Sequence, residues 1–269
     1  MNYSDVILIM DMDGTLLASS GEKAYLSEEN KQYIETFIAK GGTFSVASGR
    51  NMQNVFQALN GLKVNFPYTL MNGALSCHHE TKAVLFEQPV SRSFVKKAYR
   101  YYQQSGRVVM IVADELTMYG LRNKDVKISS HGFKWTWIKD HQLQGIKPLK
   151  LAFAVDPEMG KDVLDDLNGL NQDCQVELLP SSPYFIEMVD RGVSKGQGIL
   201  KMIERFGLQN KTLICVGDYL NDLSMLTLAD KAYVIQNGHP LLKEQFSVLS
   251  STHNECMMAE MLKIIDDLE

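Results

Sequence analysis

The stretch IMDMDGTLLA, Ile9 to Ala18, places two aspartates one residue apart, directly after an apolar run and directly before a glycine. The run that leads into it, DVILIM, is continuously apolar after its first residue, which predicts a strand buried on both faces that ends at Asp11. Burying a carboxylate is costly unless a partner compensates its charge. We therefore expect Asp11 and Asp13 to serve a cation or a substrate.

The residues after this strand predict a βαβ unit. Ser27 can cap a helix, the acidic residues Glu28 and Glu29 suit its positive N-terminus, and Gly41 and Gly42 end it. The segment TFSVAS that follows is typical of a second buried strand. A strand, a helix and a strand in this order favour two parallel strands that are adjacent or nearly so.

The same pattern returns near the C-terminus. Ser194 and Gln197 resemble a capping box for a helix that continues to about Phe206, and TLICVG predicts another buried strand. A helix over residues 222–228 and a short strand AYVI should follow.

The last helix is expected to begin at a second capping box, formed by Thr252 and Glu255. Its apolar face should fill the core through five side chains at helical spacing, Met257, Met258, Met261, Leu262 and Ile265.

The middle of the chain has a different pattern of predicted strands and helices. Strand candidates outnumber crossover helices there, which suggests an antiparallel sheet with helices on one face. The strand candidates are AVLFEQPV, RVVMIVA, LKLAFAV, CQVELL and YFIEMV, and the helices are expected at Ser93–Gln104 and Glu158–Leu167. The prediction is an α/β fold: a Rossmann-like, doubly wound parallel sheet formed by residues 1–80 and 189–269, with an α+β domain, residues 81–188, inserted into it.

Composition and charge limit the classes of partner. Hydrophobic residues make up 45% of the 269 residues and charged residues 22%, as in soluble globular proteins. The net charge of −5 and the lack of a long basic run argue against a nucleic-acid partner. The apolar run near the N-terminus is too short for a signal peptide or a membrane span, and the four cysteines lack metal-binding spacing. We expect a cytoplasmic protein with free thiols and no membrane partner.

Four short motifs fall at predicted strand ends or helix starts, where ligands bind in an open parallel sheet. They are Asp11–Thr15, Ser48–Arg50, Lys195–Gly196 and Gly217–Asp218 followed by Asn221–Asp222. Each alone has a simpler explanation as a turn, a helix start or a solvated lysine. Their joint order, which one sheet can bring together, is much less expected by chance.

The combined chemistry suits Mg²⁺ and a phosphate group. Asp11 and Asp218 would offer side-chain oxygens to the metal, and Asp13 its backbone carbonyl. The metal would also neutralise the carboxylates and allow an anionic phosphate to approach. Ser48 and the amides around Gly49 can hold phosphate oxygens.

Two further motif residues complete this predicted phosphate site. Lys195 would supply a compact positive charge, and Asn221 another hydrogen bond.

The segments DMDGTLL, SGR, SKG and GDYLNDLSM resemble the four motifs of the haloacid dehalogenase-like hydrolase superfamily. The long insertion between the second and third motifs, together with MNGA at residues 71–74 and VDRGVSKGQGI, is similar to the Cof-type branch with a type IIB cap. The resemblance spans the chain, and no motif position departs from it.

This resemblance implies a role for each matching residue. Asp11 resembles the nucleophile that becomes an aspartyl-phosphate, and Asp13 the acid/base that protonates the leaving oxygen and activates water. Met12 would offer its backbone amide to phosphate. Ser48, Gly49, Lys195 and Asn221 match the other phosphate contacts of the family. Asp218 matches the metal ligand of the fourth motif.

The expected function is Mg²⁺-dependent hydrolysis of a small phosphomonoester, such as a sugar phosphate. A phosphomutase on the same fold and a non-catalytic phosphosugar-binding module are the alternatives. The physiological substrate and the oligomeric state stay open, as do the roles of Arg50 and Asp222. Trp135 and Trp137 could line a substrate pocket or belong to a half-buried strand.

Overall fold

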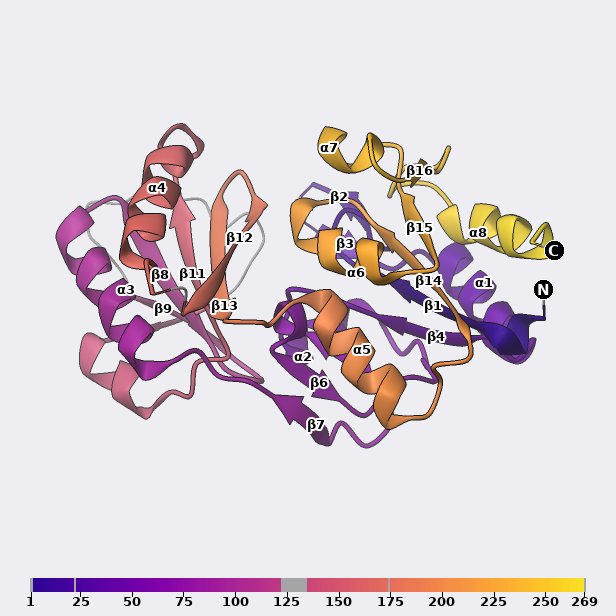
Figure 1. Ribbon diagram of the computed structural model, residues 1–269, viewed down its shortest axis with the longest axis horizontal. Helices are drawn as coiled ribbons and strands as arrows, with labels where there is room; N and C mark the ends of the chain where they lie inside the picture. The colour runs from indigo at the N-terminus through magenta and orange to yellow at the C-terminus, as the bar shows by residue number, and fades with distance from the viewer. Residues whose placement is uncertain (1, 22, 122–134, 174, 269) are drawn as a thin grey trace. The chain divides into compact units, whose positions relative to one another are not determined.

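The computed structural model describes residues 2–21, 23–121, 135–173 and 175–268, which form two compact units (Figure 1). The first unit comprises Met1–Arg50, Asn54–Phe86 and Ser194–Glu269. The second comprises Asn51–Gln53 and Glu87–Val193. Most of the second unit is therefore one continuous stretch of chain between two parts of the first.

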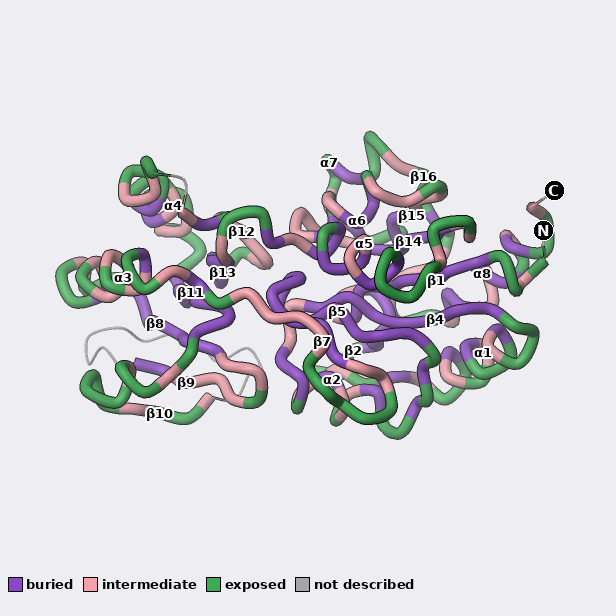
Figure 2. The backbone as a smooth tube through the Cα atoms, turned by 60° about the horizontal axis from the view of Figure 1, so that its bottom comes forward, coloured by how far each residue is buried: buried purple, intermediate pink, exposed green. Residues whose placement is uncertain are grey.

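The first unit is built around a five-stranded sheet with the order β16-β15-β14-β1-β4, in which every neighbouring pair is parallel. The strands are β1 (Val6–Met10), β4 (Thr43–Val46), β14 (Thr212–Gly217), β15 (Lys231–Val234) and β16 (Ser247–Val248). β1 and β4 are buried along their whole length (Figure 2). The strand order reverses around β1, which confirms the predicted Rossmann-like parallel core.

Helices cover both faces of this sheet. Residues of α5 (Lys195–Arg205) and α6 (Leu223–Leu228) form one apolar cluster with Ile7 and Ile9 of β1. α1 (Glu28–Ala39) packs against β4 and against α8 (Met257–Asp266). The predicted caps of α1 and α5 are confirmed, because Ser27 Oγ accepts from Asn30 N and Ser194 Oγ accepts from Gln197 N.

The predicted start of the last helix is wrong. Thr252 and Glu255 do bond to each other, but they form a separate turn before α8, which begins after Cys256. The first turn of α8 is capped instead by a distant side chain, since Asn30 Oδ1 accepts from Met258 N at 3.1 Å. The five apolar side chains predicted to fill the core from this helix are buried.

Smaller elements complete the first unit. β2 (Ala18–Ser20) pairs with β3 (Lys23–Tyr25), and β5 (Tyr68–Leu70), β6 (Leu75–Cys77) and β7 (Val84–Glu87) form a small sheet. The segment of β7, which we expected in the inserted sheet, pairs here with β6. The short helices are α2 (Met52–Ala58), which spans both units, and α7 (Pro240–Lys243).

The second unit contains a six-stranded sheet with the order β10-β9-β8-β11-β13-β12. Its strands are β8 (Val108–Ala113), β9 (Met118–Leu121), β10 (Thr136–Ile138), β11 (Lys150–Val155), β12 (Val176–Ser182) and β13 (Phe185–Asp190). All neighbours are antiparallel except β9 and β10. The helices α3 (Arg92–Ser105) and α4 (Gly160–Leu170) share an apolar cluster with one sheet face, as predicted.

The two tryptophans lie at β10: Trp135 directly precedes the strand, and Trp137 is its middle residue. Trp135 packs partly buried against the other face of the sheet, Trp137 is 50% exposed, and their rings meet edge to face. Both lie over Gly120, where a Cβ atom would come within 2.4 Å of the Trp135 ring. The sequence left a substrate pocket and a half-buried strand open for these residues, and the structure places Trp137 in β10, whose residues are exposed or only partly buried.

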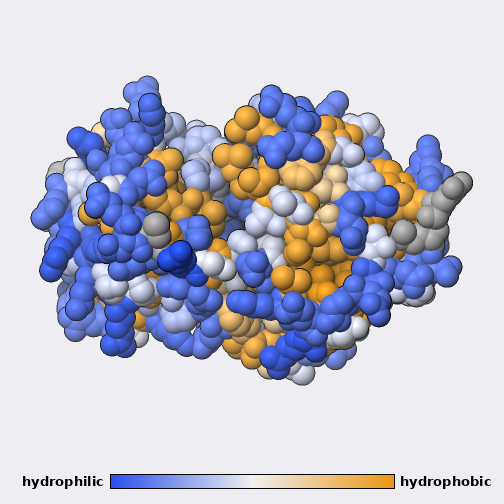
Figure 3. Space-filling view, in the orientation of Figure 1, coloured by the Kyte–Doolittle hydropathy of each residue, from blue (hydrophilic) through white to orange (hydrophobic). Residues whose placement is uncertain are grey.

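The surface of the described chain is mixed in character. Figure 3 shows hydrophilic residues over much of one face, with apolar residues gathered around α5 and α6. None of the described helices is long and apolar enough to cross a bilayer. Cys77, Cys215 and Cys256 are free thiols, and Cys174 lies outside the described residues.

Candidate active site

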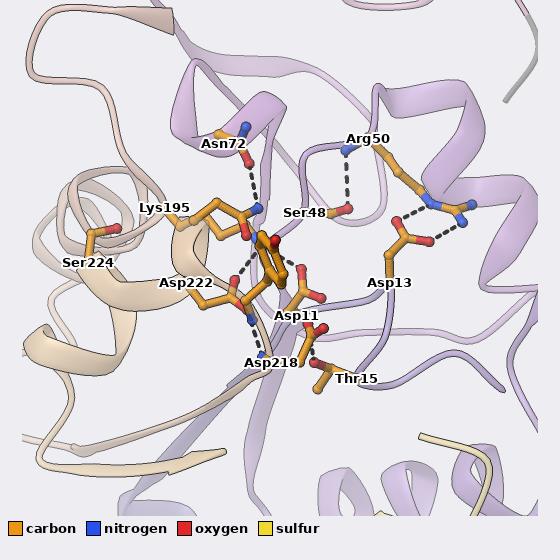
Figure 4. A network of polar contacts seen from close by, with 12 residues as sticks. Asp11, Asp13, Thr15, Ser48, Arg50, Asn72, Lys195, Asp218, Asp222 and Ser224 are labelled. Atoms are coloured by element: carbon orange, nitrogen blue, oxygen red, sulfur yellow. Dashed lines mark hydrogen bonds and ion pairs between the residues drawn. The ribbon is translucent and has the colours of Figure 1, made fainter. Parts of the chain in front are cut away.

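The ends of three parallel strands bring the sequence motifs to one edge of the central sheet. Asp11 follows β1 directly, Ser48 follows β4 after one residue, and Asp218 follows β14. Lys195 is the first residue of α5, so the third motif reaches the same edge. Figure 4 shows these side chains gathered in one network of polar contacts. The placement expected from the strand order is therefore the one observed.

A fully buried lysine lies at the centre of this network. Lys195 Nζ donates to Asp11 Oδ1 at 2.5 Å and to Asp222 Oδ1 at 2.6 Å. Burial alone would lower the pKa of Lys195, but the two carboxylates raise it above its ordinary value. Lys195 is thus a permanent cation at neutral pH, which is what a phosphate-binding position requires.

The carboxylates around this lysine carry more negative charge than it can balance. Oxygens of Asp11, Asp218 and Asp222 all lie within 4.8 Å of one another. Burial raises the pKa of Asp11 to about 7 although Lys195 opposes the shift, and burial and the neighbouring carboxylates raise the pKa of Asp218 well above its ordinary value. An excess of buried carboxylate oxygens fits a divalent cation such as Mg²⁺.

Neighbouring residues hold Asp218 beside Asp11. Thr15 Oγ1 donates to Asp218 Oδ1 at 3.0 Å. Gly14 has a φ of +79°, and a Cβ atom there would lie 2.5 Å from Asp218 Oδ2. The turn after Asp13 therefore needs a glycine both for its conformation and for the close approach of this carboxylate.

Asp222 supports the other charged groups. Its Oδ1 accepts from Lys195, and its Oδ2 accepts from the backbone amides of Asp218 and Tyr219 at 2.8 and 3.1 Å. Because both oxygens already accept hydrogen bonds, Asp222 fixes the loop that carries Asp218 and orients Lys195. This contact assigns a structural role to a residue whose role the sequence left open.

Asp13 lies apart from the three clustered carboxylates. Its side chain points toward Arg50, whose Nε donates to Asp13 Oδ2 at 2.7 Å and whose Nη2 contacts Oδ1 (Figure 4). The Asp13 side chain is 41% exposed, whereas Asp11 is buried. The two aspartates of the first motif thus occupy different environments, which suits two different chemical roles. That the Asp13 carbonyl binds a metal stays a prediction.

The predicted phosphate contacts surround Asp11. Ser48 is buried, and its Oγ accepts from Arg50 N at 3.1 Å, which closes a tight turn over Gly49. The side chain of Met12 is fully buried, as expected for a residue that would contribute only its amide. Asn221 reaches the network from the fourth motif. Their contacts with a phosphate stay predictions.

Sequence reasoning missed two contributors to this network. The pairing of Arg50 with Asp13 joins residues 37 apart in the chain, and no local pattern marks it. Asn72 accepts a hydrogen bond from Asn221 across 149 residues. The only signal for Asn72 was the motif MNGA, to which we assigned no role.

The model of the haloacid dehalogenase-like hydrolase family matches residues 8–262. The chain belongs to the haloacid dehalogenase-like hydrolase family. A curated relative, the 5-amino-6-(5-phospho-D-ribitylamino)uracil phosphatase of Bacillus subtilis, is 23% identical over 266 residues, which is 96% of this chain and 94% of that protein.

Solved structures share the whole fold. One is described as a haloacid dehalogenase subclass IIB sugar phosphatase, with 21% identity, a TM-score of 0.80 and coverage of 97% of this chain and 99% of that one. Another is a haloacid dehalogenase-like hydrolase from Bacteroides thetaiotaomicron, with 22% identity, a TM-score of 0.80 and coverage of 96% and 98%. The Cof-type, type IIB architecture that the motifs resembled is thereby confirmed.

Proposed function

We propose that this hydrolase is a Mg²⁺-dependent, cytoplasmic phosphatase that hydrolyses small phosphomonoesters, such as sugar phosphates, through an aspartyl-phosphate. The observation that carries the proposal is the close group formed by the buried residues Asp11 and Lys195 and the partly buried Asp218 at the reversal point of the sheet. It combines a nucleophile, a cation for phosphate and a place for a metal in one small volume. The name of the Bacillus subtilis relative, a phosphatase of a ribityl phosphate compound, agrees with this substrate class.

The residues of the chain divide the reaction between them. An oxygen of Asp11 attacks phosphorus, and the bond between phosphorus and the leaving oxygen breaks as Asp13, which enters this step in its acid form, gives that oxygen its proton. Water then attacks the phosphorus of the aspartyl-phosphate, Asp13 takes a proton from it, and the bond to Asp11 breaks. The products are an alcohol and inorganic phosphate, and both aspartates return to their starting states.

Two groups of residues would stabilise the charge of the transferred phosphoryl group. Lys195, the Ser48 hydroxyl, the Gly49 and Met12 amides and the Asn221 amide would contact its oxygens. Asp11 and Asp218, with the Asp13 carbonyl, would hold Mg²⁺, which when bound neutralises charge on the carboxylates and on the phosphoryl oxygens.

The test is phosphate release by the purified chain from p-nitrophenyl phosphate and from a panel of phosphorylated sugars, nucleotides and cofactor precursors, with Mg²⁺ or with EDTA. We expect metal-dependent release by the natural chain and none by Asp11→Asn. Retention of near-normal release by Asp11→Asn would refute the assignment of the nucleophile. Release that requires a bisphosphate activator would indicate a phosphomutase, and no release from any compound would indicate a binding module.

A further inference from the structure

A left-handed turn lies beside the candidate active site. The 3-10 turn η2 (Met71–Gly73) has φ values of +53°, +56° and +99° at its three successive residues, all of them buried. Left-handed backbone is unfavourable for most residues other than glycine; asparagine tolerates it, but methionine has no side-chain group that would offset the cost. Such conformations persist where the surrounding structure enforces them, and they gather at functional sites.

The backbone of this turn is fixed to the loop of the second motif. Met71 N donates to Arg50 O at 3.1 Å, and Asn72 N donates to Ser48 O at 3.0 Å. The two hydrogen bonds hold the two ends of the segment Ser48–Arg50, which includes Gly49. The position of this phosphate-binding loop therefore depends on the conformation of η2.

The same turn touches the start of α5. A Cβ atom at Gly73 would lie 2.0 Å from the backbone oxygen of Ser194, the residue directly before Lys195. Only glycine allows this approach at this φ value. The turn thus fixes the third motif relative to the second.

The side chain of Asn72 completes the connection to the fourth motif. Its Oδ1 accepts from Asn221 Nδ2 at 3.2 Å, and the residue is fully buried (Figure 4). One N–H of the Asn221 amide is committed to this bond, so the plane of the amide is set by Asn72. A buried hydrogen bond of this kind restricts a side chain that would otherwise rotate.

We propose that Asn72 is a positioning residue for phosphate binding, which acts through Asn221 from a left-handed turn that sets the spacing of the Ser48, Lys195 and Asn221 loops. The proposal rests on the proposed function in one respect, namely that a phosphate group binds among these loops. It gives the MNGA motif a role, and it accounts for the left-handed backbone of that motif.

The test variant is Asn72→Gly, because glycine accepts the left-handed conformation and removes only the amide. We expect kcat/KM for p-nitrophenyl phosphate to fall about 3-fold to 10-fold, the worth of one hydrogen bond, mainly through a higher KM. The inhibition constant of inorganic phosphate should rise by a similar factor. The matched control is Asn60→Gly, since Asn60 is also left-handed, with a φ of +45°, but is exposed and remote from the motifs. It should leave both constants unchanged.

A double-mutant cycle separates positioning from general damage. If Asn72 acts through Asn221, then Asn72→Gly combined with Asn221→Ala should be no worse than Asn221→Ala alone. The proposal would be overturned if the losses of kcat/KM in the two single variants multiplied in the double variant. It would also be overturned if Asn72→Gly kept the KM and the phosphate inhibition constant of the natural chain. Should Asn72→Gly fail to fold, Asn72→Ser, whose hydroxyl is too short to replace the amide, serves the same comparison.

A thermal-shift measurement with inorganic phosphate keeps this inference distinct from the proposed function. If the natural chain releases no phosphate from any substrate, the proposed activity fails. The shift of Tm caused by inorganic phosphate still tests Asn72, because positioning predicts a smaller shift in Asn72→Gly than in Asn60→Gly. Equal shifts in the two variants would refute the positioning role.

Discussion

Arg50 makes a bidentate contact with the Asp13 carboxylate, in which Nε donates to Oδ2 at 2.7 Å and Nη2 contacts Oδ1. Burial alone would lower the pKa of Arg50, but the hydrogen bond and charge of Asp13 raise it. A planar guanidinium fixes the orientation of a carboxylate in a way that a lysine ammonium cannot. The pair therefore orients the residue that we expect to handle the proton.

Replacing Arg50 tests this orientation. Arg50→Lys retains the charge but cannot make the bidentate contact. We therefore expect kcat/KM for a sugar phosphate to fall about 10-fold, equivalent to about 1.4 kcal/mol of transition-state stabilisation. Steady-state kinetics beside Arg100→Lys, the same change at an exposed position of α3, checks the effect. Unchanged kinetics in Arg50→Lys would mean that Asp13 needs no fixed partner.

Asp13→Asn should impair catalysis in a manner that depends on the leaving group. General acid catalysis contributes about 10² to 10⁴ in rate, so kcat/KM for a sugar phosphate should fall by a factor in this range. The fall should be smaller for p-nitrophenyl phosphate, because nitrophenolate departs without a proton. Since kcat/KM reports on the first phosphoryl transfer, equal losses for the two substrates would argue against Asp13 as the acid of that step.

The excess charge of the carboxylate group predicts that Mg²⁺ stabilises the folded chain. Binding to the folded state alone adds about 2.7 kcal/mol at 100 times Kd, which corresponds to a rise in Tm of about 5 to 10 °C. Asp218→Asn should abolish most of this rise, because burial, Asp11 and Asp222 all favour a cation at this carboxylate. Differential scanning fluorimetry with and without Mg²⁺ measures it.

The control for the metal experiment is Asp267→Asn, which removes the same charge from an exposed position after α8. It should retain the full Mg²⁺-dependent shift. A shift that survives in Asp218→Asn would place the metal elsewhere in the chain.

The sequence predicted those features that depend on neighbours in the chain. The apolar run before Asp11 and the cap at Ser27 act through local hydrogen bonds and local burial, so their patterns are visible in a few residues. The parallel pairing of β1 and β4 followed from the βαβ unit that connects them, and the same alternation near the C-terminus predicted that Asp218 would lie at a strand end of the same sheet.

The features that escaped prediction depend on contacts across long stretches of sequence. The first turn of α8 is capped at Met258 by Asn30 of α1, and the residues Thr252 and Glu255 form a turn outside the helix instead of its capping box. Asn72 and Asn221 likewise meet only because their loops are brought together by packing. No periodicity or motif rule carries that information.

Glu260 of α8 predicts a pH dependence of stability. Its Oε1 accepts from the backbone and hydroxyl of Ser250, and its Oε2 accepts from those of Ser251. Burial would raise the pKa of Glu260, but these hydrogen bonds lower it below its ordinary value of 4.5. The folded state therefore binds the proton less tightly than the unfolded state, so the stabilisation is complete above about pH 4.5. It should be lost as the pH falls through the lower pKa of the folded state.

Glu260→Gln tests this dependence, because an amide nitrogen cannot accept the hydrogen bonds of one serine. We expect the free energy of unfolding in urea to fall by about 1 kcal/mol at pH 7. The difference from the natural chain should shrink as the pH is lowered below 4.5, because protonated Glu260 loses the same acceptor. Glu244→Gln, at an exposed position just after α7, should show no such difference at any pH. A loss in Glu260→Gln that is equally large at pH 7 and pH 3.5 would show that its cause is packing and not the charge of the carboxylate.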